Sequence, residues 1–208
     1  MYLQSWGLCN SLNTDLFETI KQKHSSYSSW AVWADQTDKP KSNMGDMSIF
    51  NEEHRTTLLN QLKNNVIMVG LNISRSFSEP FRNFHDLNPR ANDFKIRFAF
   101  KNTEYYGAYM TDIIKDYEMV DSKNVIKHVK NNDLLITKSI EKIREEMKDL
   151  KSDKPIIFAF GVDTFRLLKN NIQNSEYGRL VKLTHYSHQI SKEAYRDTIL
   201  REIKIGIG

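Results

Sequence analysis

Short runs of apolar residues, each bounded by glycine or by polar residues, recur along the second two-thirds of the chain. The runs occupy 66–69, 108–113, 156–160 and 180–184. Runs of this length, several of them rich in β-branched residues, are typical of strands that are buried on both faces of a parallel sheet. The pattern therefore predicts four parallel strands.

Between these runs, apolar residues recur at helical spacing. The clearest set is Ile136, Ile140, Ile143, Met147 and Leu150, whose spacings of 4, 3, 4 and 3 place them on one face of a helix. Shorter apolar stripes predict helices just before the first strand, after the third strand and near the end of the chain. The sequence thus alternates between strands and helices.

Capping residues mark the start of three of these helices. Asp163 and Thr164 can cap the helix after the third strand, and Ser191 can cap the last one. The segment 94–100 is ambiguous, because its phenylalanines fit both a helix and an alternating strand. We choose a helix there, because Asp93 can cap it and because two parallel strands need a crossover between them.

Strands that alternate with helices imply right-handed crossovers and a three-layer α/β/α sandwich, here with a mostly parallel four-stranded central sheet. The length of 208 residues fits one domain, and no linker divides it. We therefore expect a single domain over 1–208, in which 1–50 form an N-terminal extension packed on the core. Trp30 and Trp33 of this extension could line a nucleic-acid groove, but we favour an anchoring role.

Composition narrows the class of protein without identifying an activity. Hydrophobic residues make up 39% of the chain and charged residues 27%, which is a globular balance. No apolar run approaches the ~20 residues that a membrane span needs, and no secretory signal is visible, so we expect a cytoplasmic protein. The formal net charge of +4 is diffuse, which permits a phosphate-bearing partner without arguing for one.

The chain offers little to hold a metal or a redox cofactor. Cys9 is its single cysteine, which excludes an intramolecular disulfide and any cluster held by four cysteines. We favour ordinary packing over a nucleophilic role for Cys9. The six histidines include no His-x-x-x-His helical pair with a third ligand. We therefore expect neither a metal nor another cofactor.

Polar side chains occur at the carboxyl ends of the predicted strands, where open parallel sheets bind their ligands. Asn72 follows the first strand, Asp112 lies at the end of the second, and His185 follows the fourth. Each of these residues could have a purely structural role: Asn72 in a turn, Asp112 in a hydrogen bond to a loop, and His185 as a buried histidine. Their common position at the strand ends favours a shared functional site instead.

The order of these residues resembles the uracil-DNA glycosylase superfamily over roughly residues 55–204. Gly-Leu-Asn-Ile-Ser at 70–74 resembles the Gly-x-Asn-Pro-Gly motif of that family, and His-Tyr-Ser at 185–187 resembles its His-Pro-Ser motif. Thr-Asp-Ile-Ile-Lys at 111–115 is similar to a Thr-Asn-x-x-Lys segment of some branches. The resemblance implies a parallel sheet between helices and cleavage of an N-glycosidic bond.

Such a cleavage places positive charge on the sugar and negative charge on the leaving base. The resemblance implies that Asn72 positions the attacking water and that His185 stabilises the leaving base. Phe84 is a candidate for the ring that stacks on an extruded base, although a core position suits it equally well. The candidate site residues are Asn72 and His185 for catalysis, and Gly70, Leu71, Ser74, Phe84, His85, Asp112, Ser187 and His188 for binding.

The sequence departs from the family pattern at the residue that would read the base. Asp112 stands where the family has Asn, and proline is missing after both Asn72 and His185. An Asn amide can match the carbonyl and N–H of uracil, whereas an ionised Asp offers only acceptors. We therefore expect weak or absent uracil excision, and a partner such as DNA or another nucleobase-containing ligand that presents N–H donors.

Two alternatives remain open. The chain could be a non-catalytic module that binds nucleic acid or protein on the same fold. It could also be a small-molecule hydrolase with Ser187 as its nucleophile, but it has no Gly-x-Ser-x-Gly elbow.

Overall fold

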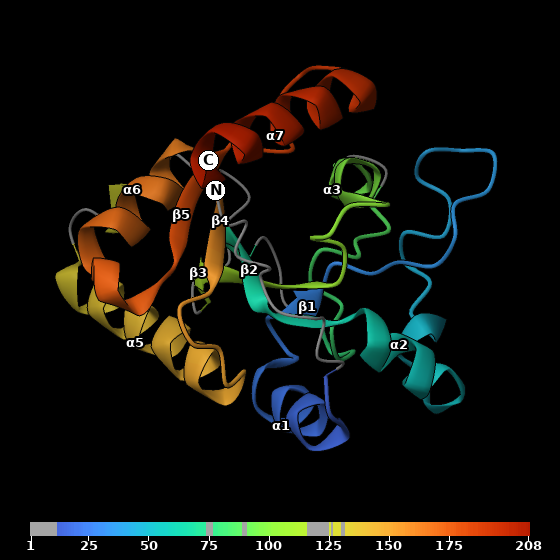
Figure 1. Ribbon diagram of the computed structural model, residues 1–208, viewed down its shortest axis with the longest axis horizontal. Helices are drawn as coiled ribbons and strands as arrows, with labels where there is room; N and C mark the ends of the chain where they lie inside the picture. The colour runs from blue at the N-terminus through green and yellow to red at the C-terminus, as the bar shows by residue number, and fades with distance from the viewer. Residues whose placement is uncertain (1–11, 74–76, 89–90, 116–124, 126, 130–131) are drawn as a thin grey trace, which may run out of the picture.

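The computed structural model describes residues 12–73, 77–88, 91–115, 125, 127–129 and 132–208. Within these ranges, a five-stranded sheet lies between two layers of helices (Figure 1). The sheet order is β1-β3-β2-β4-β5, and every neighbouring pair is parallel except β1 with β3. The strands are β1 (Ser29–Trp30), β2 (Lys63–Asn72), β3 (Ala108–Ile114), β4 (Ile156–Phe160) and β5 (Arg179–Leu183).

The prediction of a mostly parallel α/β sheet is confirmed, but the expected number of strands is wrong. The four predicted segments all form strands, and β1 adds a fifth at the edge by pairing antiparallel with β3. β1 has only two residues, too few for any alternation of apolar and polar positions to be visible in the sequence.

Helices cover both faces of the sheet. One apolar cluster joins α1, α2, α5 and α6 to the first face, and a second cluster joins α3 and α7 to the other. The bounds are α1 (Thr14–His24), α2 (Arg55–Gln61), α3 (Phe94–Phe100), α5 (Asp133–Asp149), α6 (Val162–Asn171) and α7 (Lys192–Ile207), with 3-10 turns η1 (Ser48–Phe50), η2 (Glu52–His54) and η3 (Asn174–Glu176).

The connections change face where they change direction along the sheet. The chain goes from β2 to β3 through α3 on one face, and then back to β4 and on to β5 through α5 and α6 on the other. When all crossover connections have the same handedness, a change of direction along the sheet moves the connecting helix to the other face. The direction changes between β2 and β4, which is the point where open α/β sheets bind ligands, beyond the carboxyl ends of the strands.

The predicted capping residues have different outcomes. Ser191 caps α7, because its hydroxyl accepts a hydrogen bond from the Ala194 N–H at 3.1 Å. Asp93 occupies the N-cap of α3 without a side-chain capping bond. The predicted cap at Asp163 is wrong, because α6 starts one residue earlier, after Gly161. Gly161 has φ 94°, a conformation that glycine adopts without a Cβ clash.

The N-terminal segment is anchored through its tryptophans, as the favoured interpretation predicts. Trp30 is fully buried and packs edge-on against Tyr109, with ring centroids 5.2 Å apart. Trp33 is also buried. Among the described helices, none is long and apolar enough to cross a membrane.

Candidate functional site

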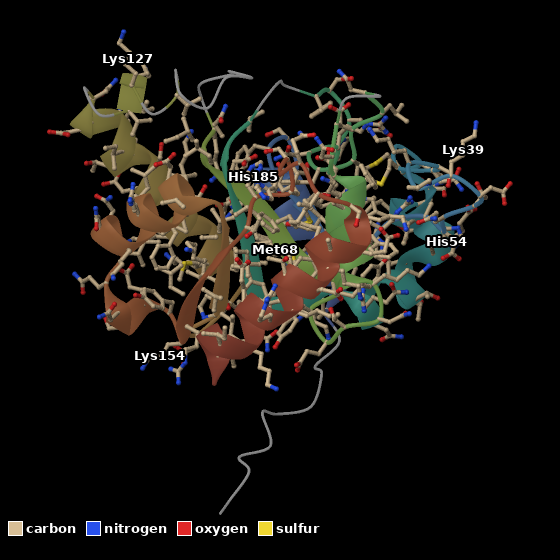
Figure 2. All side chains as sticks on the ribbon, turned by 90° about the horizontal axis from the view of Figure 1, so that it is seen from above. Lys39, His54, Met68, Lys127, Lys154 and His185 are labelled. Atoms are coloured by element: carbon tan, nitrogen blue, oxygen red, sulfur yellow. The ribbon has the colours of Figure 1, made fainter. Side chains whose placement is uncertain are left out.

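Several candidate residues lie along the face of the sheet that α3 and α7 cover. Met68, Met110 and Leu183 belong to the apolar cluster on this face. Side chains alternate along a strand, so Gly70 and Asp112, two residues further on, face the same way. His185 follows Leu183 at the end of β5, and Figure 2 shows His185 and Met68 near the middle of the molecule.

Gly70 and Asp112 are partners across the parallel strands β2 and β3. A Cβ atom on Gly70 would overlap Oδ1 of Asp112 and would lie 3.5 Å from the ring of Phe84. Only a glycine therefore lets the carboxyl group and the ring lie against the main chain of β2. The structure thus brings Gly70, Phe84 and Asp112 together.

The carboxyl group of Asp112 is enclosed by protein. The residue is 3% exposed, and the Asn83 amide donates to Oδ2 at 2.8 Å. Burial raises the pKa of Asp112 to about 6, although the Asn83 hydrogen bond and the positive charge of Lys115 oppose this rise. A carboxyl group with a pKa close to neutrality can exchange a proton under physiological conditions.

Asn83 holds the loop that precedes α3, and sequence reasoning missed it. Its amide nitrogen donates to the Tyr27 carbonyl at 2.8 Å as well as to Asp112, and its Oδ1 accepts from the Phe84 N–H at 3.1 Å. Phe81 and Phe84 have φ of 61° and 64°, a region that aromatic residues rarely adopt. Backbone strain of this kind persists only where the surrounding contacts enforce it. The sequence offered only a general signal, an Asn within a polar loop.

His185 presents a neutral ring. Its Nδ1 accepts a hydrogen bond from the Ser187 N–H at 3.1 Å and lies 2.8 Å from the Ser187 hydroxyl. Loss of contact with water lowers the pKa of His185 to about 4. Because Nδ1 is an acceptor, the ring proton is assigned to Nε2. No hydrogen bond from a described residue reaches Nε2, so His185 offers an N–H donor.

The loop after β5 is tied to α3 and lies within electrostatic range of Asp112. Lys95 donates from Nζ to the His188 carbonyl at 2.7 Å. The ring of Tyr186 stacks on that of His185, with centroids 4.2 Å apart. Burial raises the pKa of Tyr186 well above its usual value, and the charges of Asp93 and Asp112 add to the rise. Lys95 thus joins the His185 loop to α3, and the charge of Asp112 acts on Tyr186 in that loop.

Other candidates do not contribute in the expected way. Leu71 faces away, within the apolar cluster on the opposite side of the sheet. His85 is fully buried, with its ring against Trp33 and Phe50 at 5.3 and 5.6 Å, so it does not reach a surface ligand. Ser74 lies outside the described residues.

The remaining candidates are more accessible. Asn72 is half-buried, and its Nδ2 donates to the Ile73 carbonyl at 2.9 Å, which fixes the orientation of the amide. Ser187 and His188 are exposed. Phe84, in contrast, is only 4% exposed, so neither its ring nor Asp112 is open to solvent in this structure. Among the described residues, no three His, Cys, Asp or Glu side chains are grouped to hold a metal ion.

Comparison with known proteins adds no relative: no family model, no curated protein and no solved structure matches the chain.

Proposed function

We propose that the protein binds a nucleobase in DNA or in a nucleotide at the carboxyl edge of the sheet, and hydrolyses its N-glycosidic bond. The observation that carries the proposal is the neutral imidazole of His185, which presents Nε2–H beyond β5 on the sheet face that also holds Asp112. A neutral N–H donor fixed in advance stabilises the negative charge that develops on a leaving base. The motif resemblance to the uracil-DNA glycosylase superfamily supports the same reaction.

Asn72 and Asp112 have separate roles in this proposal. The amide of Asn72, oriented by its bond to Ile73, positions the attacking water at the switch point of the sheet. Asp112 selects the base. With a pKa of about 6, its carboxyl group is mostly ionised at neutral pH and accepts hydrogen bonds. It therefore favours a base with an amino group or adjacent N–H donors over uracil.

A second function, a binding module without catalysis, is favoured by the burial of Phe84 and Asp112. A ring that is 4% exposed stacks on a base only after the loop around Asn83 has moved. That loop is held by the hydrogen bonds of Asn83 to Tyr27 and Asp112. If the loop stays closed, only the outer groups, His185 and Ser187, contact a ligand.

A glycosylase assay tests the proposal. Single-stranded oligonucleotides with uracil or with one of a panel of normal and damaged bases are incubated with the wild type and with Asn72→Ala, Asp112→Asn and His185→Ala. We expect release of a base that carries N–H donors, little release of uracil, and a loss of roughly 10²-fold or more in His185→Ala. The matched control is His128→Ala, an exposed histidine between β3 and α5, which should keep full activity.

The outcomes separate the two functions. Strong release of uracil by the wild type, unchanged or reduced in Asp112→Asn, contradicts the role of Asp112 in base choice. Saturable binding of oligonucleotides with no base released supports the binding module. Neither binding nor release overturns both functions.

A further inference from the structure

A hollow lies at the amino edge of the sheet, where β2 and β3 begin. We call it the amino-edge pocket; its walls come from residues 33–35 after β1, from η1, from His54 and α2, and from the turn between α3 and β3. Its volume is about 410 Å³, which accommodates one small organic molecule. None of the candidate residues at the carboxyl edge lines it.

Tyr106, which is half-buried, and Trp33, which is 3% exposed, form a fixed wall of the amino-edge pocket, and Tyr106 supplies its accessible ring. The Tyr106 hydroxyl accepts a hydrogen bond from the Trp33 N–H at 3.0 Å and lies 3.4 Å from the Trp33 carbonyl oxygen, so each residue fixes the other. The Trp33 indole N–H donates to the Phe84 carbonyl at 3.2 Å, which sets the plane of the indole. Ile49 and Leu58 add apolar surface. Rings held in place before binding suit a flat, apolar ligand body.

The rim of the pocket holds one cation that can meet a negative charge, Lys101, and one acidic residue, Asp35. His54 also lines the rim and lies 3.4 Å from Glu53. Lys101 pairs with Asp35 at 3.2 Å, but the Asp35 side chain is 98% exposed. Exposed pairs of this kind contribute little to stability, so an incoming anion can displace Asp35 from Lys101.

A buried cation, Arg97, lies next to Ala34, which lines the pocket. Arg97 is 3% exposed, and its guanidinium donates to the carbonyls of Ala34, at 3.2 Å, and Pro40, at 2.8 Å. Its Nε has no hydrogen-bond partner among the described residues. Burial lowers the pKa of Arg97, although Tyr106 and the charge of Asp35 oppose this fall. An anion bound next to Ala34 would stabilise this charge.

We propose that the amino-edge pocket binds a small planar aromatic molecule that carries one negatively charged group. The ring lies against Tyr106, and the charged group contacts Lys101. The side chains of Gln61 and Asn102 supply neutral donors and acceptors at the rim. A nucleoside monophosphate and an aromatic carboxylate share this chemistry, and the experiment separates them. The inference does not depend on the activity proposed for the carboxyl edge.

The test is calorimetric titration of the full chain with adenosine 5′-monophosphate and with indole-3-acetate. Adenosine serves as the uncharged probe. We expect saturable binding of at least one anion, and binding about tenfold weaker in Lys101→Gln, equivalent to one charge-assisted hydrogen bond. Lys182→Gln, an exposed lysine on β5, is the charge control.

A matched pair on α2 tests the location. Thr57 lines the pocket, and the neighbouring Thr56 is exposed on the same helix without lining it. Thr57→Phe fills the hollow and should abolish binding, whereas Thr56→Phe should leave it unchanged, with equal thermal midpoints for both variants.

Three results would overturn the inference: no saturable binding of either anion, equal binding of adenosine and its monophosphate, or binding that survives Thr57→Phe. If the binding that survives Thr57→Phe is lost in His185→Ala, the ligand lies at the carboxyl edge, and the function proposed for that edge stands.

Discussion

At the scale of single residues, burial shifts the protonation of two site residues in opposite directions. It raises the pKa of Asp112 to about 6 and lowers the pKa of His185 to about 4. At neutral pH the carboxyl edge therefore combines a mostly ionised carboxyl group with a neutral imidazole. The first accepts hydrogen bonds and the second donates one, which is the pairing that the proposed base selection and leaving-group stabilisation require.

His85 gives a prediction about stability and pH. Burial lowers its pKa from 6.5 to about 3, partly opposed by the Trp30 main chain. Because the folded pKa lies below the unfolded value, the unfolded chain takes up a proton first as the pH falls. The stabilisation is complete above pH 6.5 and is lost progressively between pH 6.5 and about pH 3.

Replacing His85 should remove this dependence. Between pH 7 and pH 5, we expect the wild type to lose roughly 2 kcal/mol more unfolding free energy than His85→Phe, as measured by urea denaturation. His54→Gln is the control, because the His54 side chain is half exposed and the variant should follow the wild type. Parallel curves for the wild type and His85→Phe would contradict the burial argument.

At the scale of elements, apolar runs and helical spacing were enough to locate the four parallel strands and most of their helices. The segment 156–160 coincides with β4, because its strand is buried and bounded by Pro155 and Gly161. The start of β2 at Lys63 could not be predicted, because Lys63 pairs with Ala108 across an irregularity in the register. That pairing depends on a distant strand and not on the local pattern.

The same limit applies to the site. The positions of Asp112 and His185 at strand ends follow from the alternation of strands and helices, and the topology places both on one sheet face. The role of Asn83 could not be predicted, because its partners Tyr27 and Asp112 are 56 and 29 residues away. The burial of Phe84 depends on the same tertiary contacts.

Gly70 tests the contact between β2 and β3. In Gly70→Ala the new methyl group overlaps Oδ1 of Asp112, so we expect a loss of roughly 1–3 kcal/mol in unfolding free energy. Asp112→Ala removes the overlapping atoms, so Gly70→Ala should cost much less in that background. Guanidinium denaturation of the four proteins of this cycle measures the coupling. Additive effects would mean that the two side chains do not compete for one space.

At the scale of the whole molecule, a chain of buried polar contacts joins the N-terminal segment, the sheet and α5. His24 contacts the Tyr27 hydroxyl at 2.5 Å and Asp149 at 2.8 Å. Lys115 lies over the Tyr27 ring at 5.2 Å and pairs with Glu146 at 3.0 Å. Lys115 also donates to the main-chain carbonyl of Asp112, so these contacts reach the back of the proposed site.

The Lys115–Glu146 ion pair connects the end of β3 to α5. Both side chains are 1% exposed, and Glu146 Oε1 also accepts from the hydroxyls of Tyr109 and Thr111, at 2.8 and 2.7 Å. Lys115→Met leaves a buried carboxylate without its counter-charge, which typically costs about 3–5 kcal/mol. Glu146→Gln, added to Lys115→Met, removes that charge and keeps an acceptor for both hydroxyls. We therefore expect the double variant to recover most of the lost unfolding free energy in urea denaturation. Asp35→Asn, which breaks the exposed pair with Lys101, is the control and should change stability by less than about 1 kcal/mol. If the double variant is no more stable than Lys115→Met, the loss comes from packing of the lysine stem against Tyr27 and not from the unpaired charge.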